Sequence, residues 1–239
     1  MSIKAINIGK KIGNPSTQIL TDISFEIPDG QFLSLTGRSG SGKSTLLYML
    51  SGLDSVSSGS VMADQIDLSK MRRKEVAHFR NQKIGFVFQF NYLIAELSVL
   101  ENVLLPAKKY GQEKVRLELA KTILEKVGLI EKLNRLPRQL SGGEEQRVAI
   151  ARSLIMEPKY LFADEPTGAL DTANGEVVMK MLKEAHLDKK TTIILVTHEP
   201  DYAKRAQRQV NLADGKIISD EMLPAMMTTG SNNQNRSFL

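Results

Sequence analysis

The residues with the clearest chemistry lie in a glycine-rich segment near the start of the chain. The segment fits the pattern G-x-x-x-x-G-K-[ST], in which glycines let the backbone curl with its N–H groups pointing inward around an anion. Lys43 adds a positive charge for the β- and γ-phosphates of a nucleotide, and the Ser44 hydroxyl can ligate Mg²⁺. We therefore predict a phosphate-binding loop made of Gly37, Arg38, Ser39, Gly40, Ser41, Gly42, Lys43, Ser44 and Thr45.

The segments on either side of this loop support the prediction. An apolar run at 32–36 predicts a strand before the loop, and a helix-forming run at 45–50 follows it. A helix that starts there presents unpaired N–H donors and the positive end of its dipole to the same phosphates. The alternative interpretation is a flexible turn rich in glycine and serine, which the flanking strand and helix disfavour.

Two adjacent carboxylates follow the apolar run at 160–164, which predicts a buried strand. Asp164 can hold Mg²⁺ from the tip of that strand, and Glu165 can polarise an attacking water molecule. Neighbouring carboxylates are costly unless a cation or a substrate lies close to them. An exposed acidic turn is the alternative, and the phosphate loop in the same chain favours the catalytic interpretation.

Two further polar residues end predicted strands. Gln89 follows the run at 84–88, and its amide can touch Mg²⁺ or the attacking water; an ordinary polar strand end is the alternative. His198 follows the run at 192–197, from which it can reach the γ-phosphate. His78 and His186 lie in charged helical stretches, and we assign them no role. Together these residues supply the parts that phosphoryl transfer from ATP to water requires.

A second turn suited to anions precedes the helix predicted at 146–152. Serine and two glycines before a helix leave backbone N–H groups free for an anion, yet the chain carries no second lysine motif. We therefore expect a dimer, in which each nucleotide lies between the phosphate loop of one subunit and this turn of the other. The turn consists of Ser141, Gly142, Gly143 and Glu144.

These motifs occur in the order found in the ABC-type ATPases, and the chain resembles that family from residue 1 to about residue 219. The resemblance implies that ATP and Mg²⁺ are bound, that Glu165, His198 and Gln89 are catalytic, and that Ser44, Gln89 and Asp164 hold the metal. Carried over residue by residue, it implies a Walker A loop at Gly37–Thr45, a Q-loop at Gln89, a signature at Ser141–Glu144, a Walker B strand ending in Asp164 and Glu165, a D-loop at Asp171 and a switch histidine at His198.

Two positions depart from the family pattern. Ile12 stands where most members carry an aromatic residue that stacks on adenine, so we expect at most an apolar contact there. The signature ends in Glu144 rather than glutamine, which the branch described next tolerates.

A finer resemblance rests on the segments 85–89, 100–106 and 165–171, which are similar to the MacB-, LolD- and FtsE-type branch and to bacitracin-resistance-type ATPases. It implies an FtsX-like permease as partner and the export or release of peptides, drugs or lipoproteins. A nutrient importer is the alternative within transport. A soluble ATPase acting on nucleic acid or the ribosome is the alternative class, disfavoured because the chain has one phosphate loop and no coiled coil.

The resemblance implies an α/β fold: a RecA-like phosphate-loop core, an N-terminal antiparallel β subdomain and a helical insertion. Ser98 and Glu101 form a predicted capping box, and we place the insertion at about 93–139. The strand pattern fades after Gly215. We therefore expect the nucleotide-binding domain to cover 1–219 and a polar, disordered or weakly packed tail to cover 220–239.

Composition limits the location and the partners. The chain has 239 residues, 41% of them hydrophobic, with no cysteine and no apolar run near the ~18 residues of a membrane span. We expect it at the cytoplasmic face of the membrane, attached through its permease. The net charge is +5, with basic clusters at 72–74, 108–109 and 189–190. Solvated helix faces explain such clusters, with contact to anionic lipid or nucleic acid as the alternative; we expect no nucleic-acid partner.

The segment after Gln89 is a candidate docking surface for the permease. It carries apolar side chains just outside a strand, which form either core or an exposed groove. The residues concerned are Phe90, Tyr92, Leu93 and Ile94.

Overall fold

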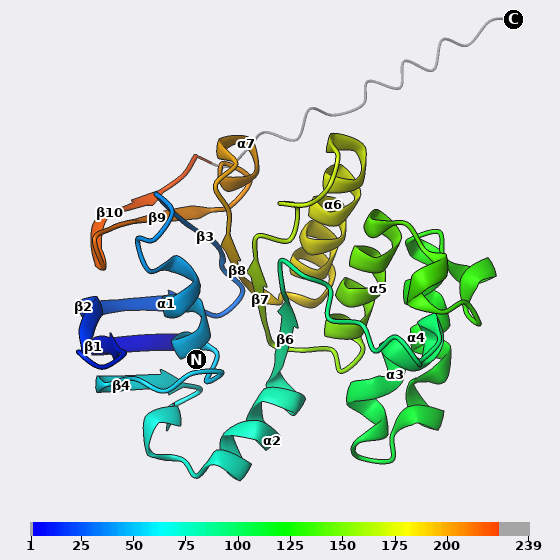
Figure 1. Cartoon of the computed structure of the whole chain (residues 1–239), viewed down its shortest axis with the longest axis horizontal. Coiled ribbons are helices and arrows are strands. Elements are labelled where there is room, and N and C mark those ends of the chain that lie inside the picture. Colours follow the sequence, from blue (N-terminus) through cyan, green and yellow to red (C-terminus); the bar gives the residue numbers. More distant parts are fainter. Residues whose placement is uncertain (1, 225–239) are drawn as a thin grey trace, which may run out of the picture.

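A computed structural model describes residues 2–224 of the chain and shows two sheets with helices packed around them (Figure 1). The first sheet is antiparallel and has the strand order β2-β1-β4-β5. Its strands are β1 (Ser2–Ile12), β2 (Thr17–Pro28), β4 (Ser58–Ala63) and β5 (Ile66–Asp67). This is the N-terminal antiparallel unit that the sequence predicts.

The second sheet carries the predicted site residues at its strand ends. Its order is β10-β9-β3-β8-β7-β6; the strands from β9 to β6 run parallel to their neighbours, and β10 is antiparallel to β9. Strands β7 and β8 are buried along their whole length, which explains their continuous apolar sequences. The strands are β3 (Phe32–Gly37), β6 (Ile84–Val87), β7 (Tyr160–Asp164), β8 (Thr192–Val196), β9 (Arg208–Ala213) and β10 (Lys216–Met222).

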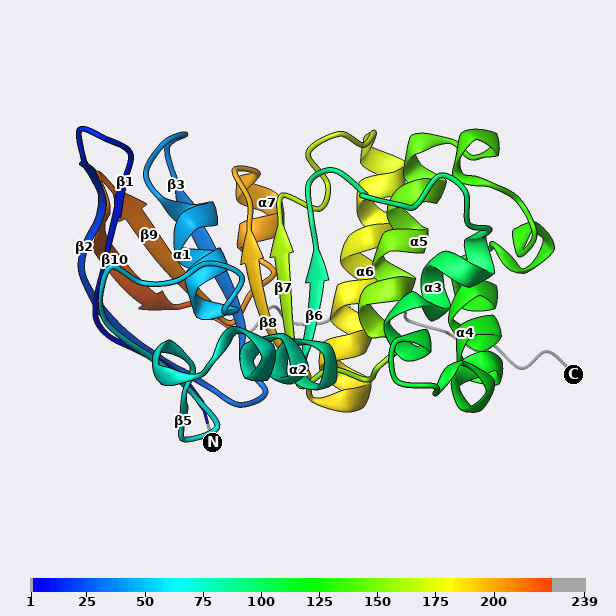
Figure 2. The ribbon, with the colours of Figure 1, turned by 60° about the horizontal axis from the view of Figure 1, so that its bottom comes forward.

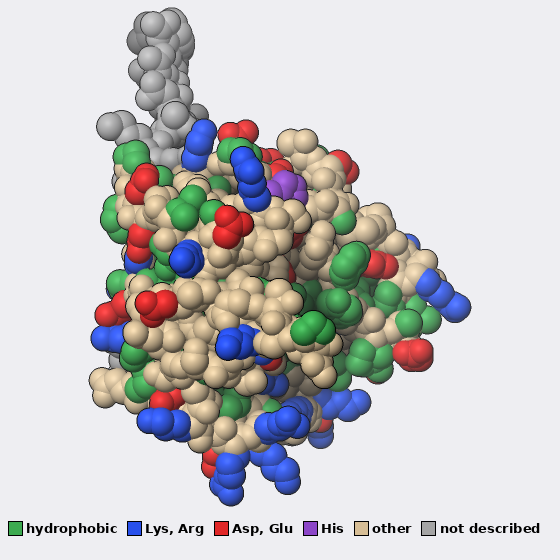
Figure 3. Space-filling view, turned by 60° about the vertical axis from the view of Figure 1, so that its left-hand side comes forward, with side chains coloured by type: hydrophobic (Ala, Val, Ile, Leu, Met, Phe, Trp, Pro, Cys, Tyr) green, Lys and Arg blue, Asp and Glu red, His purple; other side chains and the backbone are tan. Residues whose placement is uncertain are grey.

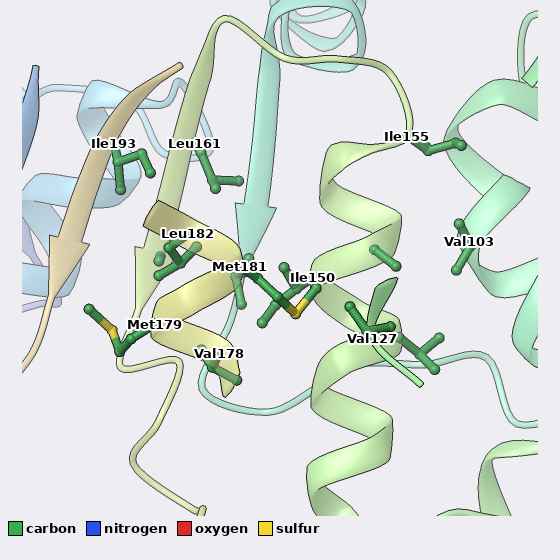
Figure 4. Packing of buried hydrophobic residues seen from close by; sticks show 14 of the residues in the cluster. Val103, Val127, Ile150, Ile155, Leu161, Val178, Met179, Met181, Leu182 and Ile193 are labelled. Carbon is green, nitrogen blue, oxygen red and sulfur yellow. The ribbon is translucent and has the colours of Figure 1, made fainter. Parts of the chain in front are cut away.

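Two hydrophobic cores lie on opposite faces of this sheet. Alternate residues of β7 serve different cores: Leu161 and Ala163 belong to one, Tyr160 and Phe162 to the other, as the period of two in a strand requires. The first core joins the sheet to α5, α6 and the helical region (Figure 4), and the second joins it to α1 and the first sheet. The helices are α1 (Lys43–Leu50), α2 (Arg73–Lys83), α3 (Val99–Lys108), α4 (Glu113–Lys126), α5 (Gly142–Leu154), α6 (Thr172–Lys189) and α7 (Pro200–Ala203).

The helical region occupies the place that the sequence predicts for the insertion. Helices α3 and α4, followed by 3-10 turns at Ile130–Lys132 and Pro137–Gln139, fill residues 99–139. The predicted capping box is confirmed: the Ser98 hydroxyl accepts from the Glu101 N–H, and the Glu101 carboxylate accepts from the Ser98 N–H at 2.9 Å.

The predicted boundary at residue 219 is wrong. Strand β10 continues through Met222 and pairs with β9 along its length, from Lys216 opposite Ala213 to Met222 opposite Arg208. The strand was missed because its exposed position as an edge strand leaves it mostly polar, without an apolar run. The remainder of the predicted tail, 225–239, lies outside the described residues.

Candidate active site

The predicted functional residues follow the carboxyl ends of four adjacent parallel strands, where open α/β sheets bind their ligands. Strand β3 leads into the phosphate loop, β8 into His198, β7 into Asp164 and Glu165, and β6 into Gln89. Figure 2 shows these strand ends at one edge of the sheet. Because the order is β3-β8-β7-β6, residues far apart in the sequence meet along this edge.

The loop between β3 and α1 depends on its glycines. Gly37, Gly40 and Gly42 all have positive φ, the region that glycine adopts without strain. At Gly37 a side chain has no room, since a Cβ would lie 2.1 Å from the Leu212 carbonyl oxygen of β9. The Lys43 ammonium folds back and donates to the carbonyls of Gly37 and Arg38, both at 2.9 Å. The loop is therefore curled before any phosphate arrives.

Two observations indicate that this loop fits a phosphate group. The Ser41 hydroxyl is buried and has no hydrogen-bond partner among the described residues, so it is a free donor inside the curl. A Cβ at Gly40 would meet nothing within 4 Å, which leaves space beside the backbone. The loop also lies against β2, because a Cβ at Gly42 would lie 2.7 Å from the Leu20 side chain. An unsatisfied donor and open space are the features that an anion requires.

The hydroxyl of Ser44 and the carboxylate of Asp164 lie together, as a shared metal site requires. Ser44 donates to Asp164 Oδ1 at 2.9 Å, across the 120 residues that separate them in sequence. Their oxygens are the hard ligands that Mg²⁺ prefers. Among residues 2–224 no group of three or more histidine, aspartate or glutamate side chains could hold a metal alone. This donor set suits a magnesium ion that takes its remaining ligands from water and phosphate.

Sequence reasoning missed Tyr48, which contacts the same carboxylate. Its hydroxyl donates to Asp164 Oδ2 at 2.8 Å, so both oxygens of Asp164 accept a hydrogen bond from α1. Burial, and then the contact with Asp164, raise the pKa of the Tyr48 phenol well above its usual range. The signal was present in the sequence, because Tyr48 is four residues after Ser44 and so shares its helix face.

Glu165 and His198 face each other next to the phosphate loop. Glu165 has a positive φ of 47°, and its N–H donates to the Val196 carbonyl of β8 at 2.9 Å. Its carboxylate lies 3.4 Å from His198 Nδ1, and the His198 side chain is 60% exposed. A hollow lined by His198, Gly37 and Arg38 extends from there. The Glu165 backbone is thus fixed at the strand end, while the imidazole is open to a ligand.

Gln89 lies at the β6 end of this row of strand ends, away from the phosphate loop that follows β3. It is exposed and follows β6, three strands from β3, a separation of about 14 Å at the usual strand spacing. With Gly142, Pro166 and Ala169 it lines a second hollow. It is therefore placed next to the predicted signature and D-loop rather than against the phosphate loop, and its catalytic and metal-binding roles stay predictions.

The predicted signature begins α5, on the helical side of the molecule. Ser141 caps this helix by accepting from the Glu144 N–H, and the Glu144 carboxylate accepts from the Ser141 N–H at 3.0 Å. Lys132 forms an ion pair with Glu144, which lowers the pKa of that carboxyl. Ser141 and Gly142 are exposed, and a Cβ at Gly142 would meet nothing within 4 Å. Figures 1 and 2 both show sheet strands between α5 and α1.

The two remaining predicted residues, Asp171 and Ile12, lie at the start of α6 and at the end of β1. Asp171 caps α6 by accepting from the Asn174 N–H at 2.8 Å, and Asn174 in turn packs against Gly143 of α5. The predicted D-loop and signature are therefore neighbours. Ile12 ends β1 and is 50% exposed, so its apolar side chain is available for contact.

Comparison with known proteins gives the same family in each case. A family model described as ABC transporter matches residues 20–168. A lipoprotein-releasing system ATP-binding protein, LolD of Leptospira interrogans, is 48% identical over 217 residues, 91% of each chain. An uncharacterized ABC transporter ATP-binding protein of Bacillus subtilis, YvrO, is 43% identical and covers 92% of this chain and 96% of its own.

The fold is shared with a solved structure. A dimeric, post-hydrolysis state of the ATP-binding cassette MJ0796, bound to ADP and phosphate, superposes with a TM-score of 0.85 and 37% identity. The match covers 93% of this chain and 99% of that one.

Proposed function

The chain belongs to the ABC transporter family of ATPases, and we propose that it is the subunit that powers an FtsX-like permease in the release of lipoproteins from a membrane. The observation that carries the ATPase assignment is the convergence of the phosphate loop, Asp164, Glu165 and His198 at one sheet edge. The cargo class rests on LolD relatives, which share up to 48% of their residues over nine-tenths of this chain.

ATP is bound through its phosphates. The N–H groups of the loop and the Ser41 hydroxyl donate to phosphate oxygens, and Lys43 exchanges its bonds to the Gly37 and Arg38 carbonyls for bonds to phosphate. Ile12 offers the adenine ring an apolar contact from the end of β1. Arg38 and Ser39 belong to the same curled segment, and Thr45 lies in the first turn of α1; we expect all three to contribute to this site.

Magnesium would be held by Ser44 and Asp164 and would neutralise charge at the β- and γ-phosphates. Gln89 follows β6, the strand next to β7, and is proposed as a further ligand from that side. The residues prepare this site in advance. Asp164 is buried, with both carboxylate oxygens occupied by hydroxyl donors, so its position is fixed. The Ser44 hydroxyl, which donates to Asp164 in this structure, would be a ligand of the metal when the nucleotide is bound.

Water activation falls to Glu165. The N–H contact to the Val196 carbonyl fixes the Glu165 backbone at the strand end, and the carboxylate there can accept a proton from a water in line with the γ-phosphate. His198 Nδ1 lies 3.4 Å from that carboxylate, and because the imidazole is exposed its other ring nitrogen is open to the γ-phosphate. Donation to both partners at once requires the imidazolium form, in which both ring nitrogens carry a proton.

Two copies of the chain complete each site. Within one subunit, Ser141 and Gly142 begin α5 on the far side of the sheet from the phosphate loop, and their backbone is open. A second subunit can present this helix start, with Asp171 beside it, to the phosphates bound by the first. The related cassette MJ0796 is dimeric, which supports the arrangement.

The permease docks on the loop after Gln89. Phe90 and Tyr92 are 65% and 64% exposed, whereas Leu93 packs against the first core. Of the two alternatives for this segment, core and exposed groove, Leu93 fits the first. Helix α5 holds the loop at two places: Glu145 accepts from the Asn91 side chain at 3.1 Å, and Arg152 donates to the Asn91 and Tyr92 carbonyls at 2.7 Å.

The permease also determines where the chain acts. No helix within residues 2–224 is long and apolar enough to cross a membrane. We propose that the chain works at the cytoplasmic face through its partner, with no nucleic-acid ligand.

Purification from membranes tests this function. The chain should co-purify with a permease, and the complex in lipid vesicles should release a membrane-anchored lipoprotein only with ATP. A soluble substrate-binding protein in the complex would instead indicate an importer. If the pure complex does not hydrolyse ATP, the ATPase assignment itself is wrong.

A further inference from the structure

Positive charge is concentrated in one short segment of this chain. Residues 70–83 contain six lysines and arginines and a single acid, Glu75, so their net charge of +5 equals that of all 239 residues. Figure 3 shows lysine and arginine side chains gathered along the bottom of the molecule, where Figure 1 places α2. The rest of the chain is neutral in sum, so this segment accounts for the whole imbalance.

Several of these positive charges lie at the N-terminus of α2, where they do not stabilise the helix. Arg72, Arg73 and Lys74 occupy the N-cap and first turn of α2, and cations there oppose the helix dipole. Glu75 offsets part of this by accepting from the Arg72 N–H at 2.8 Å and pairing with its guanidinium. Arg73 and Lys74 are exposed, and no ion pair is recorded for them within residues 2–224. Cations in the first turn that are only partly compensated point to a function.

The fold adds a second basic cluster to the first. The His78 ring meets Tyr110 at 3.2 Å between Nδ1 and the phenol oxygen, and Asn81 donates to the Pro106 carbonyl. These contacts bring the end of α3 against α2. Lys109 lies with its ammonium 5.6 Å from the centre of the Tyr110 ring. We define the α2 basic surface as Lys70, Arg72, Arg73, Lys74, Lys108 and Lys109.

This surface adjoins the proposed docking loop. Asn102 of α3 binds the loop by accepting from the Ile94 N–H at 2.8 Å, and Pro106 of the same helix accepts from α2. Four residues of helix separate the two contacts, about 6 Å along its axis. A permease docked on the loop would therefore bring the α2 basic surface close to the membrane.

We propose that the α2 basic surface binds anionic lipid headgroups of the membrane that contains the permease. The placement rests on the proposed function, while the charge asymmetry does not. Exposed lysines and arginines attract a negatively charged leaflet through its surface potential, which reaches only about a Debye length. Within this surface Lys70 pairs with Asp67 and Arg72 with Glu75, whereas the other four cations form no ion pair within residues 2–224. Single-stranded nucleic acid would require exposed aromatic stacking, and the aromatic ring in this surface, Tyr110, is engaged by His78.

The test compares two variants with equal loss of charge. The first carries Arg73→Gln, Lys74→Gln and Lys109→Gln. The control carries Lys180→Gln, Lys183→Gln and Lys204→Gln, which are exposed residues on α6 and after α7. Removing cations from the first turn of α2 should not weaken the helix, so both variants are expected to fold. Binding of the full-length chain is measured by sedimentation with vesicles of phosphatidylcholine, alone or mixed with phosphatidylglycerol.

We expect the native chain and the control variant to bind only the mixed vesicles, and to be released by salt. The first variant should bind at least about tenfold more weakly, since each basic residue at a charged leaflet contributes to affinity. Equal binding by both variants, or absence of binding to the mixed vesicles, would overturn the proposal. So would tighter, variant-sensitive binding to a DNA or RNA oligonucleotide.

Two further measurements separate this proposal from the function on which it rests. ATP hydrolysis by the chain and co-purification with the permease should be unchanged in the first variant. If those hold while lipid binding is absent, only the lipid proposal fails. If the chain binds anionic vesicles but neither hydrolyses ATP nor co-purifies with a permease, the proposed function is wrong and the lipid-binding proposal is still supported.

Discussion

The Asp164 carboxylate is held from two sides by hydroxyl groups of one helix. Ser44 was predicted from the phosphate-loop pattern, because that pattern specifies a hydroxyl next to the lysine. Tyr48 was not, because no motif includes it and only the geometry of α1 brings it to Asp164. Motifs therefore predicted the residues that we propose to touch the nucleotide, whereas a residue that supports them, Tyr48, became visible only in the structure.

Replacing Tyr48 with phenylalanine removes one of the two hydrogen bonds to Asp164 and keeps the ring near Phe86. We expect the free energy of unfolding to fall by about 1 kcal/mol, the usual net contribution of such a bond at a half-buried site. Urea denaturation without nucleotide measures this. We also expect more Mg²⁺ to be needed for half-maximal ATPase activity, because Asp164 is then less firmly placed; an unchanged requirement would show that Ser44 suffices.

Elements with strong local signals were predicted well. The strands β7 and β8 are buried on both faces and read as uninterrupted apolar runs, and the Ser98 capping box marks the start of α3. Strand β10 was missed because more than half of its residues are polar and because it forms by pairing with β9, which no local pattern reveals. For Leu93 the sequence left core and groove open, since whether an apolar residue after a strand faces core or solvent is decided by the neighbouring helices; in the structure it is partly buried against the first core.

The curled shape of the phosphate loop depends on Gly37 more than on Gly40. In Gly37→Ala the new Cβ meets the Leu212 carbonyl at 2.1 Å, so β3 and β9 must separate. We expect a loss of about 3 kcal/mol or more in unfolding free energy and of measurable ATP binding. Gly40→Ala is the matched control, since its φ is also positive but its surroundings are open; about 1 kcal/mol is expected there. Equal losses would mean that backbone conformation alone governs the loop.

At the scale of the whole molecule, the chain carries two turns suited to anions, which we propose to be the two halves of a nucleotide site. The sequence predicts such a division from the count of motifs, because two such turns accompany a single lysine motif. The structure adds the separation of α1 and α5 by the sheet. The identity of the permease and of the cargo could not be predicted from these residues, since both belong to other chains.

Glu165→Gln should preserve ATP binding and abolish water activation, so that an ATP-bound dimer accumulates. We expect hydrolysis to fall by roughly a hundredfold or more, the usual contribution of a general base. Light scattering after gel filtration with ATP and Mg²⁺ measures the dimer, ideally together with the permease. Glu165→Gln combined with Lys43→Ala is the control, because weaker phosphate binding should return the monomer. A monomer for Glu165→Gln at high protein concentration would contradict the composite site.

Tyr92 and Leu93 distinguish docking from folding. Tyr92→Glu changes an exposed side chain, so we expect permease co-purification to be lost while ATP binding and stability of the isolated chain persist. Leu93→Glu places a charge against the first core and should destabilise the isolated chain itself. Co-purification from membranes and thermal unfolding measure the two effects. If Tyr92→Glu unfolds the chain, the side chain is structural and the docking surface lies elsewhere.

The two attachments between α5 and the docking loop have a mechanical meaning. Glu145 and Arg152 are seven residues apart, two turns or about 10 Å along the helix. If α5 held the loop at one point, a movement of the helix would displace the loop but leave it free to rotate. Because α5 holds the loop at two points, the loop must also rotate with the helix. Helix α5 begins with the turn that would contact the nucleotide of a neighbouring subunit. A tilt of α5 caused by that contact should therefore rotate the docking loop through the same angle, and the permease would receive a rotation as well as a displacement.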